Sequence, residues 1–217
     1  VVSLGRLPMH VPMRFGDDAR RSLDGQWAFE LFPHPDAVPA TAVLGATPQG
    51  ARTVAVPGNW TVQGVGDHPH YTNVQMPFEG PPPNLPSHNP TGVYRRSFTV
   101  SSRWRYKGGR VVLHLGGAES VHAVYLNDEF VGYGTDSRLP SEYDITDLVH
   151  DGENDLCLVV ARFSAQSYVE DQDQWWMAGL HRSVGLEARA AVHVADVTVD
   201  AGWREGTASL ALDVRVA

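Results

Sequence analysis

Short β-type runs, separated by turn-forming residues about every ten positions, are the feature that most limits how this chain can fold. No segment has a helical period, apart from single turns expected at 101–106 and 145–149. The pattern predicts an all-β domain, a β-sandwich or jelly roll, because paired sheets leave few strand edges unsatisfied. The runs cover residues 26–31, 53–56, 93–100, 110–115, 120–126, 130–133, 143–145, 154–163 and 183–189.

Two of these runs carry further information. The one at 154–163 is almost continuously apolar from Leu156 to Val160, which predicts a central strand covered on both faces. Asn127-Asp128 separates two neighbouring runs. Both residue types tolerate positive φ, so this dipeptide predicts a two-residue hairpin turn.

The spacing of the runs divides the chain into three parts. Residues 1–22 have no apolar period and predict an extended arm that packs on another part of the protein or on another subunit, with disorder as the alternative. Residues 23–189 form the sandwich. Residues 190–217 hold two alternating runs around a turn at 202–206, as at the start of a second sandwich. Two strands do not form an independently stable sheet, so the chain is expected to be part of a longer protein.

The net charge, the lengths of the apolar runs and the cysteine content limit the partners and the location expected for this protein. The net charge is −8, which disfavours nucleic acid and anionic membrane. No apolar run is long enough to span a bilayer, and no basic-plus-apolar segment of the leader type opens the sequence, so a cytoplasmic protein is expected, with a leader removed before Val1 as the alternative. Cys157 is the single cysteine. It stands in an apolar run and is expected to be a buried hydrophobe.

An acidic, Trp-containing stretch at 167–182 is the strongest functional candidate. It joins Glu170, Asp171 and Asp173 to the adjacent Trp175 and Trp176. Carboxylates can bind several sugar hydroxyls, and indole faces offer apolar area to the C–H side of a sugar. The alternative is a solvated acidic turn beside a core tryptophan. Because neighbours in a strand face opposite sides, one tryptophan is expected to point inward.

Motifs along most of the chain resemble glycoside hydrolase family 2, in its large β-galactosidase branch. The matching segments are E-D-Q-D-x-W-x-M-x-G-x-x-R at 170–182, W-T-V-Q-G…Y-T-N-V at 60–74, N-P-T-G at 89–92, V-G-Y-G-x-x-S-R-L-P-S-E-Y-D at 131–144, R-L-P-M-H at 6–10 and S-L-D-G-Q-W at 22–27. The resemblance implies a galactose-binding-like jelly roll over 23–189, followed by an immunoglobulin-like domain and a (β/α)8 barrel. Residues 190–217 would then be the truncated start of the immunoglobulin-like domain.

The same resemblance implies a function for the parent protein, retaining hydrolysis of terminal non-reducing β-D-galactose from β-galactosides of the lactose type. The catalytic glutamate pair of the family lies on the barrel, so no catalytic residue is expected in this chain. Asn73 would bind galactose hydroxyls, and Asp173 would bind both galactose and a sodium ion. Magnesium ligands would lie outside the chain. The expected partners are the substrate, the barrel of the same polypeptide and further copies in a homo-oligomer.

Other interpretations stay open at this point. Asn73 could instead stabilise its own loop, and Asp173 could be a solvated surface acid. The parent could be a β-glucuronidase or β-mannosidase of the same family, or the chain could be a free-standing lectin-like module. His68 and His70 lack further metal ligands at a recognisable spacing. A final hypothesis joins Arg138, Glu142 and Arg182 in an ion-pair network; simple exposure is the alternative.

Overall fold

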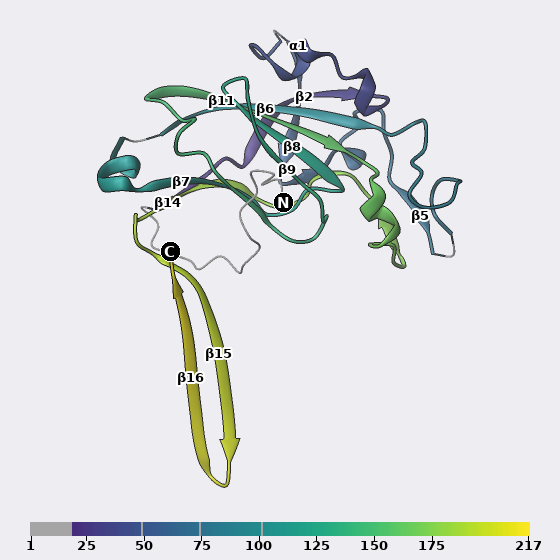
Figure 1. Cartoon of the computed structure of the whole chain (residues 1–217). Coiled ribbons are helices and arrows are strands. Elements are labelled where there is room, and N and C mark those ends of the chain that lie inside the picture. The colour runs from purple at the N-terminus through teal and green to yellow at the C-terminus, as the bar shows by residue number, and fades with distance from the viewer. Residues whose placement is uncertain (1–18, 49, 74, 101) are drawn as a thin grey trace.

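The structure is a computed structural model, and it describes residues 19–48, 50–73, 75–100 and 102–217. Two antiparallel sheets form a β-sandwich (Figure 1), which confirms the all-β sandwich expected from the sequence. The larger sheet has the order β3 (Arg52–Val56), β2 (Gly25–Phe32), β6 (Thr91–Val100), β11 (Gly152–Ala161), β8 (Val121–Leu126) and β9 (Glu129–Gly134). The smaller has the order β1 (Arg20–Ser22), β14 (Val184–Arg189), β7 (Arg110–Leu115) and β10 (Ser141–Asp144).

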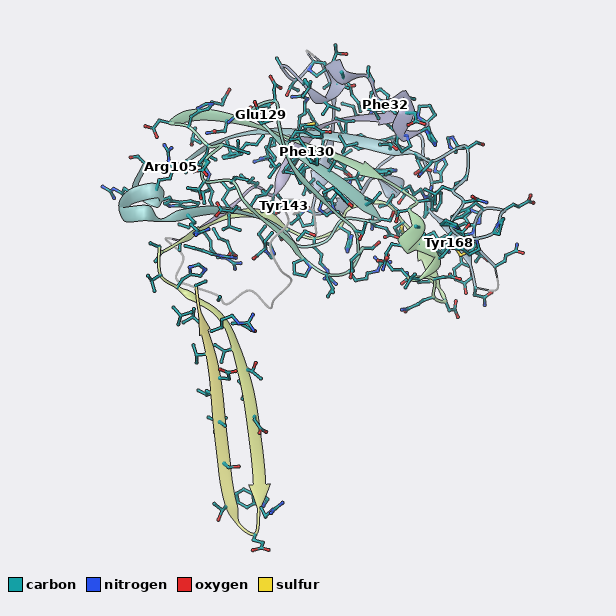
Figure 2. The ribbon with its side chains drawn as sticks, in the orientation of Figure 1. Phe32, Arg105, Glu129, Phe130, Tyr143 and Tyr168 are labelled. Atoms are coloured by element: carbon teal, nitrogen blue, oxygen red, sulfur yellow. The ribbon has the colours of Figure 1, made fainter. Side chains whose placement is uncertain are left out.

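The core lies between the two sheets. Alternation along β8, where every second residue is buried, is typical of a strand with one face against a core. Tyr143, which Figure 2 labels, is fully buried. The largest core side chains also include Trp27, Trp60, Tyr94 and Leu158.

Two local predictions are confirmed. β11 lies between β6 and β8, as expected of the apolar run at 154–163. Asn127 and Asp128 have φ of 52° and 68° and connect β8 to β9. Cys157 in β11 is buried, and burial raises the pKa of its thiol to about 12. This cysteine is therefore part of the packing and not a reactive thiol.

Short elements complete the sandwich, and the sequence did not predict most of them. They are the ladder of β5 (His70–Thr72) with β12 (Gln174–Trp176), the ladder of β4 (Gly58–Asn59) with β13 (Gly179–Leu180), the helix α1 (Ala40–Val43), and the 3₁₀ turns η2 (Pro35–Ala37), η3 (Trp60–Val62), η4 (Ser102–Gly108) and η5 (Ala165–Tyr168). Of these, η4 matches the turn expected at 101–106. Arg105 in η4 and Tyr168 in η5 lie at opposite ends of the sandwich (Figure 2).

The described residues at the two ends of the chain are placed differently with respect to the sandwich. Residues 1–18 of the expected arm lie outside the described residues. Within 19–22, β1 pairs with β14 and so joins the smaller sheet. At the other end, β15 (Val194–Arg204) and β16 (Thr207–Val216) form a long hairpin that extends away from the sandwich (Figure 1). Its turn is at Glu205-Gly206, where both residues have positive φ.

Candidate functional site

The candidate site is built on a two-stranded ribbon, the β5–β12 ladder, at the end of the sandwich that carries η5 (Figure 1). Its register pairs Thr72 with Gln174 and Tyr71 with Trp175. Residues opposite each other in an antiparallel pair point to the same face, and neighbours along a strand point to opposite faces. The ribbon therefore has one face with Tyr71 and Trp175 and another with Trp176.

This alternation separates the two tryptophans. Trp176 is 5% exposed and its ring packs 6.3 Å from that of Phe163, whereas Trp175 is 55% exposed. The expectation that one of the pair points inward is thus met by Trp176. Trp175 lies on the outer face, with its ring centroid 5.5 Å from that of Tyr71.

Asn73 and Asp173, the two residues expected to bind substrate, lie at the same end of the ribbon. They directly follow and precede the paired residues Thr72 and Gln174, and both are exposed. Tyr71 Oη donates a hydrogen bond of 2.6 Å to Asp173 Oδ1. This bond to the carboxylate raises the pKa of the Tyr71 phenol. The structure thus brings together two residues that are far apart in the sequence.

The three carboxylates of the acidic stretch have different surroundings. Glu170 accepts hydrogen bonds from the backbone N–H of Ser137 at 2.8 Å and from its Oγ at 2.5 Å. Ser137 is buried, so Glu170 anchors the stretch to the segment after β9. Asp171 is exposed. Glu170 is consequently a structural group, and Asp173 is the carboxylate of this stretch that faces outward beside an aromatic pair.

A buried ion pair supports the base of the ribbon. Arg162 Nη1 lies 2.5 Å from Asp67 Oδ1, and Arg162 Nη2 donates to the Trp176 carbonyl oxygen at 3.1 Å. The other oxygen of Asp67 accepts from Trp60 Nε1 at 2.8 Å. Burial lowers the pKa of the Arg162 guanidinium, and Asp67 opposes that shift. This pair was not predicted from the sequence, although an arginine at the end of an apolar strand is a visible signal.

Aromatic contacts hold the Pro-rich loop that follows β5. The ring of Phe78 lies 4.9 Å from that of Phe163 and 5.4 Å from that of Tyr168. Tyr168 Oη also donates to the Asn84 carbonyl oxygen at 2.6 Å. The loop and the acidic stretch are therefore fixed to each other through η5.

The predicted network of Arg138, Glu142 and Arg182 is wrong as a single cluster. Arg138 pairs with the buried Glu119 at 3.1 Å, and Arg182 donates to the Arg138 carbonyl oxygen at 2.5 Å. Glu142 belongs to another group, where Arg189 binds it at 2.6 Å. Burial raises the pKa of Glu119, and Arg138 counteracts that effect. Sequence proximity suggested one network, but Glu142 lies in β10, whereas Arg138 and Arg182 lie in loops and contact each other.

The side chain of Asp173 is of a type that sodium sites use. Sodium is a hard cation that takes oxygen ligands, and within the described residues Oδ2 of Asp173 accepts no hydrogen bond. A carboxylate oxygen of Asp173 would contribute one ligand, with the remaining ligands from elsewhere. His68 and His70 are both exposed and belong to no cluster of metal-ligand groups in the described part of the chain.

One other group could hold a metal ion by geometry, on the smaller sheet. Ligand atoms of His114, Glu142 and Glu187 lie within 4.8 Å of one another. Arg189, however, binds both carboxylates, at 2.6 and 2.9 Å, and Arg20 also pairs with Glu187. The guanidinium groups already neutralise these carboxylates, so no metal is needed to explain the cluster.

Within the described residues, no helix combines the length and the apolar character needed to cross a membrane.

Comparison with known proteins gives the family. Residues 20–190 match the family model described as glycosyl hydrolases family 2, sugar binding domain. A β-galactosidase of Erwinia tasmaniensis is 40% identical over 92% of this chain and 20% of its own length. A β-galactosidase of Alteromonas mediterranea is 41% identical over 89% of this chain and 19% of its own length. The chain thus spans about a fifth of the length of these relatives.

Solved structures support the fold. A β-glucuronidase of Bifidobacterium dentium superimposes with a TM-score of 0.69 at 24% identity, covering 94% of this chain and 37% of that one. A β-glucuronidase of Ruminococcus gnavus gives a TM-score of 0.72 at 19% identity, over 97% of this chain and 36% of that one. With β5 and β12, which come from the motifs at 60–74 and 170–182, paired in one ribbon and a family match over 20–190, the chain belongs to glycoside hydrolase family 2 and carries its sugar-binding domain.

Proposed function

We propose that this chain forms one wall of the galactose-binding site of a retaining β-galactosidase. The observation that carries the proposal is the placement of Asn73 and Asp173 at one end of the β5–β12 ribbon, beside exposed aromatic rings. Relatives at about 40% identity are β-galactosidases, which favours galactosides over glucuronides or mannosides as substrates. The parent enzyme would hydrolyse terminal non-reducing β-D-galactose.

The chemistry assigned to each residue follows from its side chain. The Asn73 amide both donates and accepts, so it suits ring hydroxyls in either orientation. The Asp173 carboxylate accepts from hydroxyls and provides an oxygen for sodium. Sodium, when bound, would add a positive charge that attracts sugar oxygens. Magnesium would be held by residues outside this chain, as would the other walls of the site.

Hydrolysis with retention needs two carboxyl groups about 5–5.5 Å apart across the scissile bond. Glu170 is engaged by Ser137 and Asp173 by Tyr71, so neither is arranged as a free acid–nucleophile pair. We therefore place the catalytic pair on the rest of the polypeptide, against which this domain would pack within an oligomer.

The isolated chain is expected to show no turnover of a chromogenic β-galactoside, because it lacks that pair. The measurement is release of the chromophore by the purified 217-residue chain, with the full-length enzyme as the positive control. Clear hydrolysis by the isolated chain would contradict the assignment of the catalytic groups.

Asp173→Ala in the full-length enzyme is expected to lower kcat/KM for a β-galactoside by about 10- to 100-fold, since removing a charged hydrogen-bond partner costs about 1.5–3 kcal/mol. The same variant should lose most of its activation by sodium. Steady-state kinetics over a sodium titration measures both effects. Asp171→Ala is the matched control, because Asp171 is an exposed neighbour without an assigned role. Equal behaviour of the two variants would remove Asp173 from the site.

A further inference from the structure

The hydrogen bond between Tyr71 and Asp173 has the geometry of a strong interaction. Its Oη–Oδ1 distance is 2.6 Å, within the range of about 2.5–2.7 Å for a hydroxyl that donates to an ionised carboxylate. Both side chains are exposed. Exposed side chains usually lose such contacts by rotation, so a persistent bond needs a constraint on at least one partner.

Trp175 supplies that constraint. It is paired directly with Tyr71 across the ribbon, and their ring centroids are 5.5 Å apart with an interplanar angle of 44°. Asp173 is two residues before Trp175, so strand alternation puts it on the same face. Tyr71 thus contacts Trp175 opposite it and reaches diagonally to Asp173, a spacing that long side chains bridge across antiparallel strands. The indole restricts the phenol ring, and the ring directs its hydroxyl.

The bond also places the two oxygens of the Asp173 carboxylate in different environments. Oδ1 accepts from Tyr71, while Oδ2 accepts no hydrogen bond within the described part of the chain. A carboxylate fixed through one oxygen presents the other in a defined direction. A group held in place before binding loses less conformational freedom when its ligand arrives.

We infer that Tyr71 is a positioning residue, which orients Asp173 towards the galactosyl group and its sodium ion. This inference rests on the proposed function of Asp173. It gives the Tyr71–Trp175 pair a role without requiring either ring to touch the sugar.

A double-mutant cycle in the full-length enzyme tests the inference, with Tyr71→Phe, Asp173→Ala and the double variant compared with wild type. Phenylalanine keeps the ring against Trp175 and removes only the hydroxyl. Tyr71→Phe is expected to raise both the KM for the galactoside and the sodium concentration for half-maximal activation about 10-fold, the effect of one charge-assisted hydrogen bond. In the Asp173→Ala background it should cause no further change. The thermal unfolding midpoint should stay at the wild-type value in Tyr71→Phe.

The outcomes distinguish the positioning role of Tyr71 from the proposed function of Asp173. If Asp173→Ala is impaired and Tyr71→Phe is not, the positioning role is overturned and the proposed function stands. If Tyr71→Phe raises the KM and the sodium requirement by the same factor in the wild-type and Asp173→Ala backgrounds, Tyr71 acts independently of Asp173. That result also overturns the inference. If Asp173→Ala alone behaves as wild type, the proposed function itself fails.

Discussion

A half-buried histidine within the acidic stretch makes the stability of the domain depend on pH. This residue is His181, and burial, together with the nearby charges of Arg138 and Arg182, lowers its pKa from 6.5 to about 4. Burial disfavours the charged form of a histidine. The folded state consequently holds His181 neutral at pH values where the unfolded chain would bind a proton.

The sign of the pH effect follows from this difference. Stability is complete above about pH 6.5 and is lost as the pH falls towards 4, because the unfolded state binds more protons in that window. For this partly exposed group we expect a loss of about 1–2 kcal/mol between pH 7 and 5. Urea unfolding of the chain at both pH values measures it. His181→Gln should reduce the pH dependence, and His70→Gln, at an exposed position, should not. The same change in unfolding free energy between pH 7 and 5 in wild type and His181→Gln would contradict the prediction.

At the scale of elements, whether a strand could be predicted from the sequence depended on the number of residues in it. The runs that became β6, β8 and β11 were found because each is long enough to show either alternation or a continuous apolar segment. The strands β5 and β12 have three residues each, too few to show a period, and so the ribbon was missed. Asn73 was selected by resemblance alone, and resemblance singled out Asp173 among the three carboxylates of the acidic stretch. Their proximity comes from the register of β5 and β12, which local patterns do not encode.

The Arg162–Asp67 pair is expected to determine how firmly the ribbon is attached. Arg162→Met would leave a carboxylate with a 10% exposed side chain without its cation, which typically destabilises a protein by about 3–5 kcal/mol. Chemical denaturation of the 217-residue chain gives the value. Arg105→Met is the control, since its partner Asp151 is 76% exposed and such pairs contribute less than about 1 kcal/mol. Equal losses would show that Arg162 does not support the fold in this way.

At the scale of the whole molecule, the β15–β16 hairpin is the part that the sandwich does not cover. Its register pairs Val199 with Leu212 and Ala201 with Leu210, so these apolar residues share one face. Leu212 is 56% and Trp203 73% exposed. A contiguous apolar face of this kind marks a contact surface. That residues 190–217 begin an immunoglobulin-like domain stays a prediction.

The isolated chain is therefore expected to self-associate through this face. Leu212→Lys should shift the chain towards monomer, whereas Ala211→Lys, on the opposite face of the same strand, should not. Sedimentation velocity at several protein concentrations measures the association. A truncation after residue 190 should also be monomeric and unfold at the same temperature as the full chain. Monomeric behaviour of the wild-type chain would count against the apolar face as a contact surface.

The ribbon also has a consequence for the order of events during synthesis. Tyr71 and Asp173 are 102 positions apart, so a nascent chain leaving the ribosome contains Tyr71 long before Asp173. No partial translation product that ends before Trp176 can offer the paired surface. Under the proposed function, galactose or sodium would bind only after the sandwich has closed, and any stabilisation by these ligands would favour completely folded chains over intermediates.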